Sequence, residues 1–256
     1  MSKVTLAQLQ FSVTPGDVRH NLDSALQLSE KALTSAQVDF LVLPEMWSTG
    51  FGSKRMIVDS IDSTTYILNK FRHLAMYYKV TIICGSLPDL RNGNLYNTSF
   101  VIDSTGEIIG NYSKNHLFLL TGEQTVFSPG TGPQVIATAK AKIGLAICFD
   151  LRFPELFRIY RKELVDIVFI PSQFPAPRLD HWITLNKARA IENQYYIVAT
   201  NCIGQCGPFD CFGQSLVINP WGEVVSNAGE TNGYIITTID MKEIDSVREK
   251  LPCPID

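Results

Sequence analysis

Short apolar stretches along the chain alternate with segments whose apolar residues recur at helical spacing. Residues 38–43 and 166–171 are almost continuously apolar, which indicates strands that are covered on both faces. Residues 21–35 and 63–78 instead carry apolar side chains three and four positions apart, which is typical of amphipathic helices. The same patterns predict further strands at 4–11, 80–87, 95–102, 107–112, 142–148, 195–202, 212–218 and 234–239, and further helices at about 155–162 and 179–193.

Nothing in the sequence divides these elements into separate units. No linker rich in Pro, Gly or Ser, no charge block and no short repeat interrupts the 256 residues. We therefore predict a single α/β domain over residues 1–256, with a mixed sheet and helices packed on its faces. Residues 103–106 are predicted to turn a central hairpin, and residues 219–222 to turn between 212–218 and 234–239.

The charge balance bears on the partners of the protein. There are 25 acidic and 22 basic residues, a formal net charge of -3, so electrostatics gives no reason to expect nucleic acid or an anionic membrane as a partner. The first residues lack the apolar stretch of a signal peptide, and the apolar runs elsewhere are far shorter than a membrane span. We expect a cytoplasmic protein with neither a nucleic acid nor a membrane partner.

Six cysteines raise the questions of disulfides and of a metal site. A reducing cytoplasm argues against disulfides, and a chain of this length does not need them. Cys202, Cys206 and Cys211 cluster, but their spacing departs from the common paired-cysteine pattern and all four histidines lie elsewhere. We predict plain buried thiols here, and no metal.

Two residues that follow apolar strands are candidates for chemistry. Glu45 comes directly after 38–43, where burial would raise the pKa of its carboxyl and suit it to general base catalysis. Cys148 comes at the end of 142–148, where the field of the following helix would favour a thiolate. A capping carboxylate and an inert core thiol are the structural alternatives.

Two further residues are weaker candidates when each is taken alone. Lys114 follows the predicted central hairpin, and an ammonium held in a cleft stabilises an oxyanion. Glu123 lies in a predicted loop. A surface lysine and a solvated carboxylate are the ordinary alternatives, and composition and spacing leave open whether these four side chains converge.

The segments around these residues resemble the carbon–nitrogen hydrolase (nitrilase) superfamily. The resemblance lies in Leu-Pro-Glu-Met-Trp at 43–47, Tyr-Ser-Lys-Asn-His-Leu-Phe at 112–118 and Ile-Cys-Phe-Asp-Leu-Arg-Phe-Pro-Glu at 147–155, in the order of the family. Glu123 with Phe-Ser-Pro-Gly at 127–130 is similar to the second glutamate of the family, and residues 181–194 and 219–223 also match. The resemblance spans nearly the whole chain.

This resemblance implies a fold and a set of roles. The expected fold is a four-layer αββα sandwich of the nitrilase type, with mixed sheets and helices on the outer faces, assembled as a homodimer that stacks αββααββα. It implies that Cys148 is the nucleophile, Glu45 the general base and Lys114 the oxyanion stabiliser, with the backbone N–H of Phe149 as second oxyanion donor. Glu123 would orient the lysine or the substrate amide. No cofactor is implied.

Three segments are most similar to the omega-amidase branch of that superfamily. They are Pro-Glu-Met-Trp-Ser-Thr-Gly-Phe at 44–51, residues 148–155 and Pro-Ala-Pro-Arg-Leu-Asp-His-Trp at 175–182. The branch implies ω-amides of 2-oxo acids, such as 2-oxoglutaramate and 2-oxosuccinamate, as small-molecule substrates. Arg178 is the candidate partner of the substrate carboxylate, because a guanidinium holds a carboxylate through two parallel bonds. Candidate substrate-binding walls are Trp47, Phe118 and Trp182.

Arg152 follows the nucleophile, and we expect it to form a structural ion pair beneath that turn. Three other functions remain open at this point. A nitrilase or an N-carbamoyl amidase would use the same Glu, Lys and Cys, and a non-catalytic interaction protein could keep the same fold.

Overall fold

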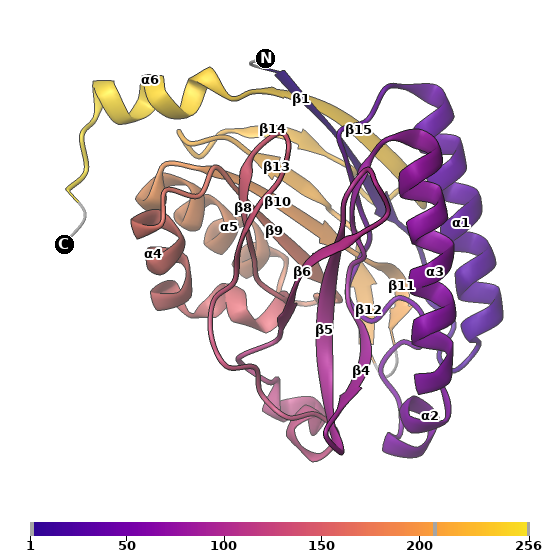
Figure 1. The fold of residues 1–256 in the computed structure, drawn as a ribbon. Coiled ribbons are helices and arrows are strands. Elements are labelled where there is room, and N and C mark those ends of the chain that lie inside the picture. The colour runs from indigo at the N-terminus through magenta and orange to yellow at the C-terminus, as the bar shows by residue number, and fades with distance from the viewer. Residues whose placement is uncertain (1–2, 207–208, 255–256) are drawn as a thin grey trace.

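A computed structural model of the chain describes residues 3–206 and 209–254, without the side chains of residues 206 and 209. Two β-sheets pack face to face, and helices cover the outer face of each (Figure 1). The layers therefore run helix, sheet, sheet, helix. This confirms the predicted α/β class and the αββα sandwich, but it corrects the single sheet that the apolar pattern alone suggested.

The first sheet has seven strands and mixed directions. The order is β15-β1-β2-β3-β5-β4, with β6 paired to β5, and the pairs β1–β2 and β2–β3 are parallel. Its strands are β1 (Lys3–Gln10), β2 (Phe40–Val42), β3 (Thr81–Ile83), β4 (Leu87–Arg91), β5 (Asn94–Ile102), β6 (Ile108–Ser113) and β15 (Gly233–Asp240).

The second sheet has six strands in the order β14-β13-β10-β9-β8-β7, with β8, β9 and β10 parallel. Its strands are β7 (Val135–Ala137), β8 (Lys142–Leu145), β9 (Ile167–Ser172), β10 (Tyr196–Asn201), β13 (Leu216–Ile218) and β14 (Val224–Asn227). A separate two-stranded ribbon joins β11 (Ile203–Cys206) to β12 (Phe209–Phe212).

The central strands β2 and β3 of the first sheet are buried on both faces, which explains their apolar sequences. In β2, Phe40 and Val42 join the core between the two sheets, whereas Leu41 joins the core beneath the helices. Phe40 meets Phe169 of β9 across the sandwich, with ring centroids 5.3 Å apart. Successive side chains of β2 thus pack alternately into two separate hydrophobic cores.

The helices form the outer layers. Helices α1 (Val18–Ser35) and α3 (Ile61–Tyr78) cover the first sheet, and α4 (Pro154–Lys162) and α5 (Leu179–Asn193) cover the second (Figure 1). Asp17 caps α1 by accepting a hydrogen bond from the His20 N–H, and Pro154 begins α4, where its missing N–H costs nothing. Two further helices are α2 (Lys54–Asp59) and α6 (Lys242–Lys250).

The last strands differ from the prediction. Residues 219–222 do turn, but they join β13 to β14, a strand that the sequence did not suggest. Strand β15 pairs antiparallel with β1 in the other sheet, so the predicted hairpin between 212–218 and 234–239 is wrong. The apolar pattern also missed α2, β7, the ribbon β11–β12 and α6.

Candidate active site

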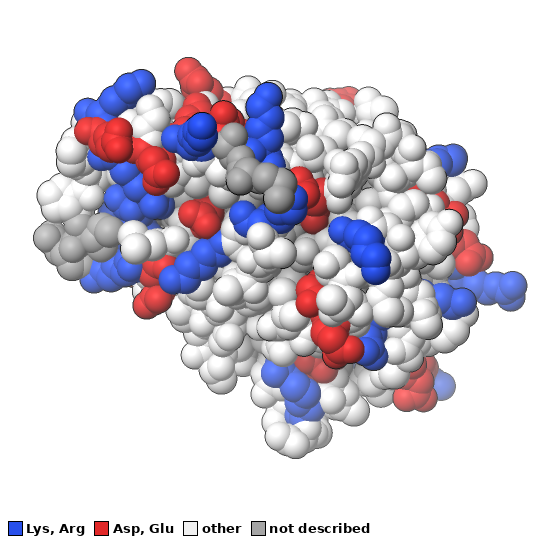
Figure 2. Space-filling view, turned by 45° about the horizontal axis from the view of Figure 1, so that its top comes forward, with Lys and Arg blue, Asp and Glu red and all other residues white. Residues whose placement is uncertain are grey.

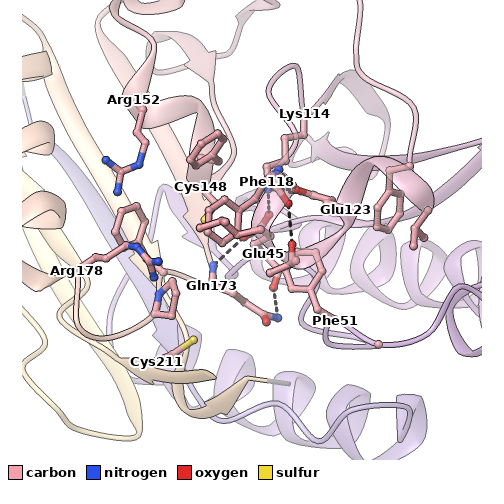
Figure 3. A pocket seen from close by; sticks show the side chains of 18 of the residues that line it. Glu45, Phe51, Lys114, Phe118, Glu123, Cys148, Arg152, Gln173, Arg178 and Cys211 are labelled. Atoms are coloured by element: carbon pink, nitrogen blue, oxygen red, sulfur yellow. Dashed lines mark hydrogen bonds and ion pairs between the residues drawn. The ribbon is translucent and has the colours of Figure 1, made fainter. Parts of the chain in front are cut away.

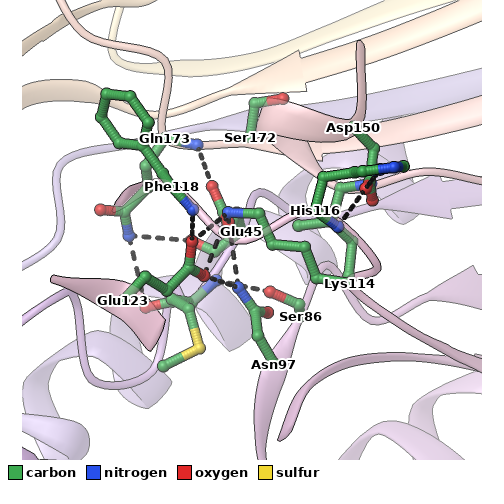
Figure 4. Close-up of polar contacts among 12 residues, drawn as sticks. Glu45, Ser86, Asn97, Lys114, His116, Phe118, Glu123, Asp150, Ser172 and Gln173 are labelled. Atoms are coloured by element: carbon green, nitrogen blue, oxygen red, sulfur yellow. Dashed lines mark hydrogen bonds and ion pairs between the residues drawn. The ribbon is translucent and has the colours of Figure 1, made fainter. Parts of the chain in front are cut away.

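Glu45 lies in the turn that follows β2, and its side chain is completely buried. Its Oε1 accepts hydrogen bonds from Lys114 Nζ at 2.8 Å and Asn97 Nδ2 at 3.0 Å. Its Oε2 accepts one from the backbone N–H of Gln173 at 2.8 Å, which follows β9 in the opposite sheet. Oε2 therefore has more lone-pair capacity free for a proton than Oε1 (Figure 4).

Lys114 and Glu123 complete a buried charged cluster. Lys114 follows β6, and its Nζ lies 2.9 Å and 3.1 Å from the two carboxylate oxygens of Glu123. Glu123 begins a 3₁₀ turn (Glu123–Thr125) and also accepts the backbone N–H of Phe118 at 2.6 Å. Two carboxylates thus hold one ammonium. Glu123 is therefore buried, and it is not the solvated loop carboxylate that was the ordinary alternative for this residue.

Cys148 follows β8 by three residues and begins a 3₁₀ helix, Cys148–Arg152. Its φ is 47°, a left-handed conformation that side chains other than glycine adopt rarely and that is found at strained functional sites. Asp150 fixes this turn, because its carboxylate accepts the N–H of Ile147 at 3.0 Å and the hydroxyl of Tyr112 at 2.7 Å. The Phe149 N–H lies in the first turn, where amides lack an intrahelical acceptor.

Electrostatics make the thiol the neutral member of the site. Burial raises the pKa of Cys148 well above its ordinary value, and the Glu45 charge raises it further while Lys114 opposes the rise. Burial and the Glu45 carboxylate thus oppose the thiolate that the sequence suggested. Burial also raises the pKa of the Glu45 carboxyl, as predicted, although the Lys114 ammonium opposes that rise.

Lys114 stays charged at all working pH values. Burial alone would lower the pKa of the ammonium, but the charges of Glu123 and then Glu45 raise it well above its ordinary value. The site thus offers a neutral thiol, a carboxylate beside it and a fixed positive charge. These are the elements that nucleophilic attack on a carbonyl group requires: a nucleophile, its base and an oxyanion donor.

A cavity of about 350 Å³ opens onto these groups (Figure 3). Glu45, Lys114, Glu123 and Cys148 all line it. Its walls are largely aromatic and apolar, and they include Phe51, Phe118, Phe127, Phe149 and Phe174. A mostly apolar pocket with a few convergent polar groups is the usual form of a small-molecule site.

Two guanidinium groups also line this cavity, those of Arg152 and Arg178 (Figure 3). Arg178 lies over the ring of Phe118 at 5.6 Å, and Arg152 Nη2 lies 3.1 Å from His181 Nδ1. Within residues 3–206 and 209–254, neither arginine forms an ion pair with an acidic side chain. The predicted structural ion pair of Arg152 is therefore wrong, and both positive charges face the pocket.

The structure moves two predicted wall residues into the core. Trp47 packs between Phe11 and Phe71, and its indole N–H donates to the Cys84 carbonyl at 2.9 Å. Trp182 packs against Phe174 and donates to the Gln214 carbonyl. Neither indole lines the cavity, so these two predictions are wrong. Phe118 and Arg178 do line it.

The cysteine cluster also differs in part from the prediction. Cys202 is a buried free thiol, but Cys211, which lines the cavity, is in a disulfide. The side chain of Cys206 lies outside the described residues. Among the residues that are described, no group of three or more His, Cys, Asp or Glu side chains is arranged to hold a metal ion.

Comparison with known proteins places this arrangement in a family. The family model described as carbon–nitrogen hydrolase matches residues 3–249. The chain belongs to the carbon–nitrogen hydrolase family. A 2-oxoglutaramate amidase of Bacillus subtilis is 36% identical over 250 residues, which cover 98% of this chain and 96% of that protein.

Two other similarities extend over almost the same length. A human omega-amidase is 30% identical over 263 residues, covering 98% of this chain and 92% of that protein. The crystal structure of a Saccharomyces cerevisiae protein from branch 10 of the nitrilase superfamily superposes with a TM-score of 0.90 at 28% identity, covering 98% of this chain and 95% of that one. That the whole of 1–256 is one domain stays a prediction.

Sequence reasoning missed two residues of this carbon–nitrogen hydrolase site, Asn97 and Gln173. Gln173 follows the apolar strand β9 and lines the cavity, and its Nε2 donates to the Glu45 carbonyl at 2.8 Å. The rule that singled out Glu45, a polar residue directly after a buried strand, would have found it. Asn97 lies within β5, where Thr98 and Ser99 follow it, and nothing in this polar run distinguishes Asn97 from its neighbours.

Proposed function

We propose that this protein is an omega-amidase, which hydrolyses the ω-amide of a 2-oxo dicarboxylic acid such as 2-oxoglutaramate or 2-oxosuccinamate. One observation carries the proposal: the buried Glu45, Lys114 and Cys148 line a small cavity that two guanidinium groups also line, and in the described part of the chain neither guanidinium has an acidic partner. The first three groups suit an amide, and the guanidiniums suit a carboxylate on the same molecule. The names of the two relatives agree with such a substrate.

The first half-reaction forms a thioester. Glu45 takes the thiol proton as Cys148 Sγ attacks the amide carbon, and the carbonyl oxygen becomes an oxyanion held by Lys114 Nζ and the Phe149 N–H. A base is needed because the buried thiol is neutral. Glu45 then returns the proton to the amide nitrogen, the carbon–nitrogen bond breaks, and ammonia leaves.

The second half-reaction releases the acid. Glu45 takes a proton from a water molecule, the resulting hydroxide attacks the thioester carbon, and the same donors hold the second oxyanion. The carbon–sulfur bond breaks and Cys148 regains a proton from Glu45. The carboxylic acid that forms gives its remaining proton to the solvent or to the released ammonia and leaves as a carboxylate. In this scheme Glu123 holds the Lys114 ammonium in place. No cofactor takes part in these steps.

The decisive experiment measures ammonia release from 2-oxoglutaramate and 2-oxosuccinamate by the purified protein and by Cys148→Ala. We expect release that Cys148→Ala abolishes. Full turnover by Cys148→Ala would refute the scheme. No release, with Cys148 still alkylated by iodoacetamide, would move the search to nitriles and carbamoyl amides. An unreactive Cys148 would favour a non-catalytic protein.

Arg178 is the proposed partner of the substrate carboxylate, because it lines the cavity without an acidic partner among the described residues. Arg178→Met should raise KM about 10-fold or more for an amide with a carboxylate and leave a neutral amide of equal length nearly unchanged. Arg158→Met is the matched control, since Arg158 lies exposed on α4 away from the cavity. Equal increases of KM for both amides would exclude this role.

We also propose that the protein is a homodimer. Ile159, Leu164 and Ile191 in and beside α4 and α5 are 41%, 56% and 51% exposed, which leaves apolar surface on this outer layer. Light scattering after size-exclusion chromatography tests this, and a monomer at micromolar concentration would contradict it.

The helices and the surface charge bear on the other expected partners and on the location. No helix in residues 3–206 and 209–254 has both the length and the apolar character needed to cross a bilayer. Basic and acidic side chains are interspersed on the face that Figure 2 shows. The cytoplasmic location and the lack of nucleic acid and membrane partners stay predictions.

A further inference from the structure

Asn97 is the uncharged member of the buried cluster, and the reaction scheme above does not use it. It lies in β5 and is completely buried. Its Nδ2 lies 3.0 Å from Glu45 Oε1 and 3.2 Å from Glu123 Oε1 (Figure 4). A primary amide nitrogen carries two hydrogens, so one Asn97 side chain can donate to both carboxylates at once.

The side-chain oxygen of Asn97 shows that the two carboxylates impose the orientation of its amide group. Its Oδ1 is buried and has no hydrogen-bond partner among the described residues. Turning the amide over would place that oxygen against two carboxylate oxygens, which repel it, so the nitrogen must face them. A buried acceptor without a donor is costly, and the two bonds to charged oxygens offset that cost.

Asn97 also contacts the third member of the cluster. Its backbone carbonyl accepts the backbone N–H of Lys114 at 2.9 Å, which fixes the start of the lysine side chain. One residue of β5 thus touches Glu45, Glu123 and Lys114, which come from three other segments. Within residues 3–206 and 209–254, Lys114 is the one other residue that donates hydrogen bonds to both carboxylates.

We propose that Asn97 is a positioning residue, which holds the Glu45 and Glu123 carboxylates together against the Lys114 ammonium and favours the charged form of Glu45. The proposal rests on the proposed function through the role of Glu45 as base. A hydrogen bond donated to a carboxylate stabilises its charged form. Asn97 and Lys114 both donate to Oε1, whereas Oε2 accepts one hydrogen bond, from the Gln173 N–H, and keeps a lone pair for the thiol proton.

Four titratable groups face Glu45, and each belongs to a different segment. They are Lys114 after β6, Glu123 in its 3₁₀ turn, Cys148 after β8 and Cys202 after β10, whose Sγ is 4.0 Å from the Glu45 carbonyl oxygen. Burial and then the Glu45 charge raise the pKa of Cys202, so this thiol stays neutral. Burial raises the pKa of the Glu45 carboxyl, so we assign the acid limb of Cys148 reactivity against pH to Glu45.

The test measures the rate of Cys148 alkylation by iodoacetamide against pH, together with kcat/KM for any amide that the protein hydrolyses. The variants are Asn97→Leu, which removes the donor, and Asn97→Asp, which adds a third carboxylate. For Asn97→Leu we expect the acid limb of both pH profiles, the alkylation rate and kcat/KM, to move to higher pH by about one unit. For Asn97→Asp we expect it to move further. Cys148→Ala gives the background alkylation of the other cysteines.

Thr98→Val is the matched control, because Thr98 is the next residue of β5 and its buried hydroxyl contacts Ser113 rather than the carboxylates. It should leave the acid limb in place. If Asn97→Leu does not fold, Asn97→Ser removes the same contacts with a smaller side chain. Folded Asn97 variants whose rate falls while the acid limb stays unmoved would show a merely structural role and overturn the proposal.

The two proposals fail in different ways. Absence of ammonia release from every amide would defeat the proposed function, but the alkylation profile needs no substrate and would still be measurable. An unmoved alkylation profile with normal ammonia release would defeat the role of Asn97 and leave the amidase in place.

Discussion

Replacing Lys114 by Met tests the charged cluster most directly, because the change keeps the length of the side chain and removes its charge. The three side chains of Lys114, Glu45 and Glu123 are at most 1% exposed, and the ammonium lies within 3.1 Å of both carboxylates. Removing one partner of such a buried pair leaves a charge without compensation, which costs about 3–5 kcal/mol. For a chain of this size the melting temperature should fall by about 10 °C.

The stability lost in Lys114→Met should depend on pH, and the pKa of Glu45 determines in which direction. Burial already raises the pKa of Glu45, and losing the opposing Lys114 charge would raise it further. A carboxyl whose pKa is higher in the folded protein than in the unfolded chain stabilises the fold at low pH and loses that contribution as pH rises through the folded value. Lys114→Met should therefore be destabilised less at pH 5 than at pH 8.

Urea denaturation at the two pH values measures this difference, and Lys142→Met is the control. Lys142 is 41% exposed and 3.9 Å from its acidic partner Glu163, so its loss should change stability by less than about 1 kcal/mol at either pH. The same Lys114→Met protein should lose kcat by about 100- to 1,000-fold, the usual effect of one oxyanion donor. Equal destabilisation at both pH values, or unchanged kcat, would refute the reasoning.

Two other changes test the base and the turn that carries it. Glu45→Gln should lower kcat by about 100- to 10,000-fold. It should also slow Cys148 alkylation near pH 7, because the neutral thiol would then have no base. Unchanged alkylation would contradict the role of Glu45 as base. Gly85→Ala should destabilise the fold by about 3 kcal/mol or more, because its φ is 62° and a Cβ there would lie 1.9 Å from the Pro44 carbonyl oxygen. Gly93→Ala, with φ 78° and nothing within 4 Å, should cost about 1 kcal/mol, and thermal unfolding of the two variants measures the difference.

Local patterns predicted the elements well where burial is continuous along the chain. The helix predicted at 179–193 has those bounds in the structure, and the apolar run at 166–171 is strand β9. Three-residue strands such as β7 and the six-residue α2 carry too few positions to show a period. Their existence depends on neighbours that are distant in the sequence.

The partners of each strand could not be predicted from the pattern. β13 and β15 look alike as apolar runs, yet β13 pairs with β10 and β15 pairs with β1 of the other sheet. An apolar strand shows that both faces are covered but not which strand lies beside it. The resemblance to a family supplied the two-sheet architecture that periodicity alone did not.

In the candidate site too, single residues could be predicted from the local sequence, but their convergence in space could not. Glu45 and Cys148 could be singled out because each follows an apolar strand, but their convergence with Lys114 and Glu123 depended on the resemblance. Trp47 and Trp182 were misplaced because a large aromatic residue near a motif fits a pocket wall and a core equally well. The structure decides, since both indole rings are fully buried and both N–H groups donate to backbone carbonyls.

The site exists only where the two sheets meet, and this links its chemistry to the packing of the sandwich. Glu45 follows β2 of the first sheet, whereas Cys148 and Gln173 follow β8 and β9 of the second. The sheets are joined at the site itself, because the Gln173 N–H donates to Glu45 Oε2 and the Glu45 N–H donates to the Ser172 carbonyl. The distance between base and nucleophile is therefore set by the spacing of the sheets rather than by any single loop.

Phe40 and Phe169 lie on the two strands that carry Glu45 and Gln173, and both are fully buried where the sheets face each other. A smaller side chain at either position lets the sheets approach or leaves a cavity, and a close-packed interior passes such a change to its neighbours. A displacement of about 1 Å between reacting groups is enough to cost about 100-fold in rate. Phe40 and Phe169 thus belong to the determinants of activity, although neither side chain lines the cavity.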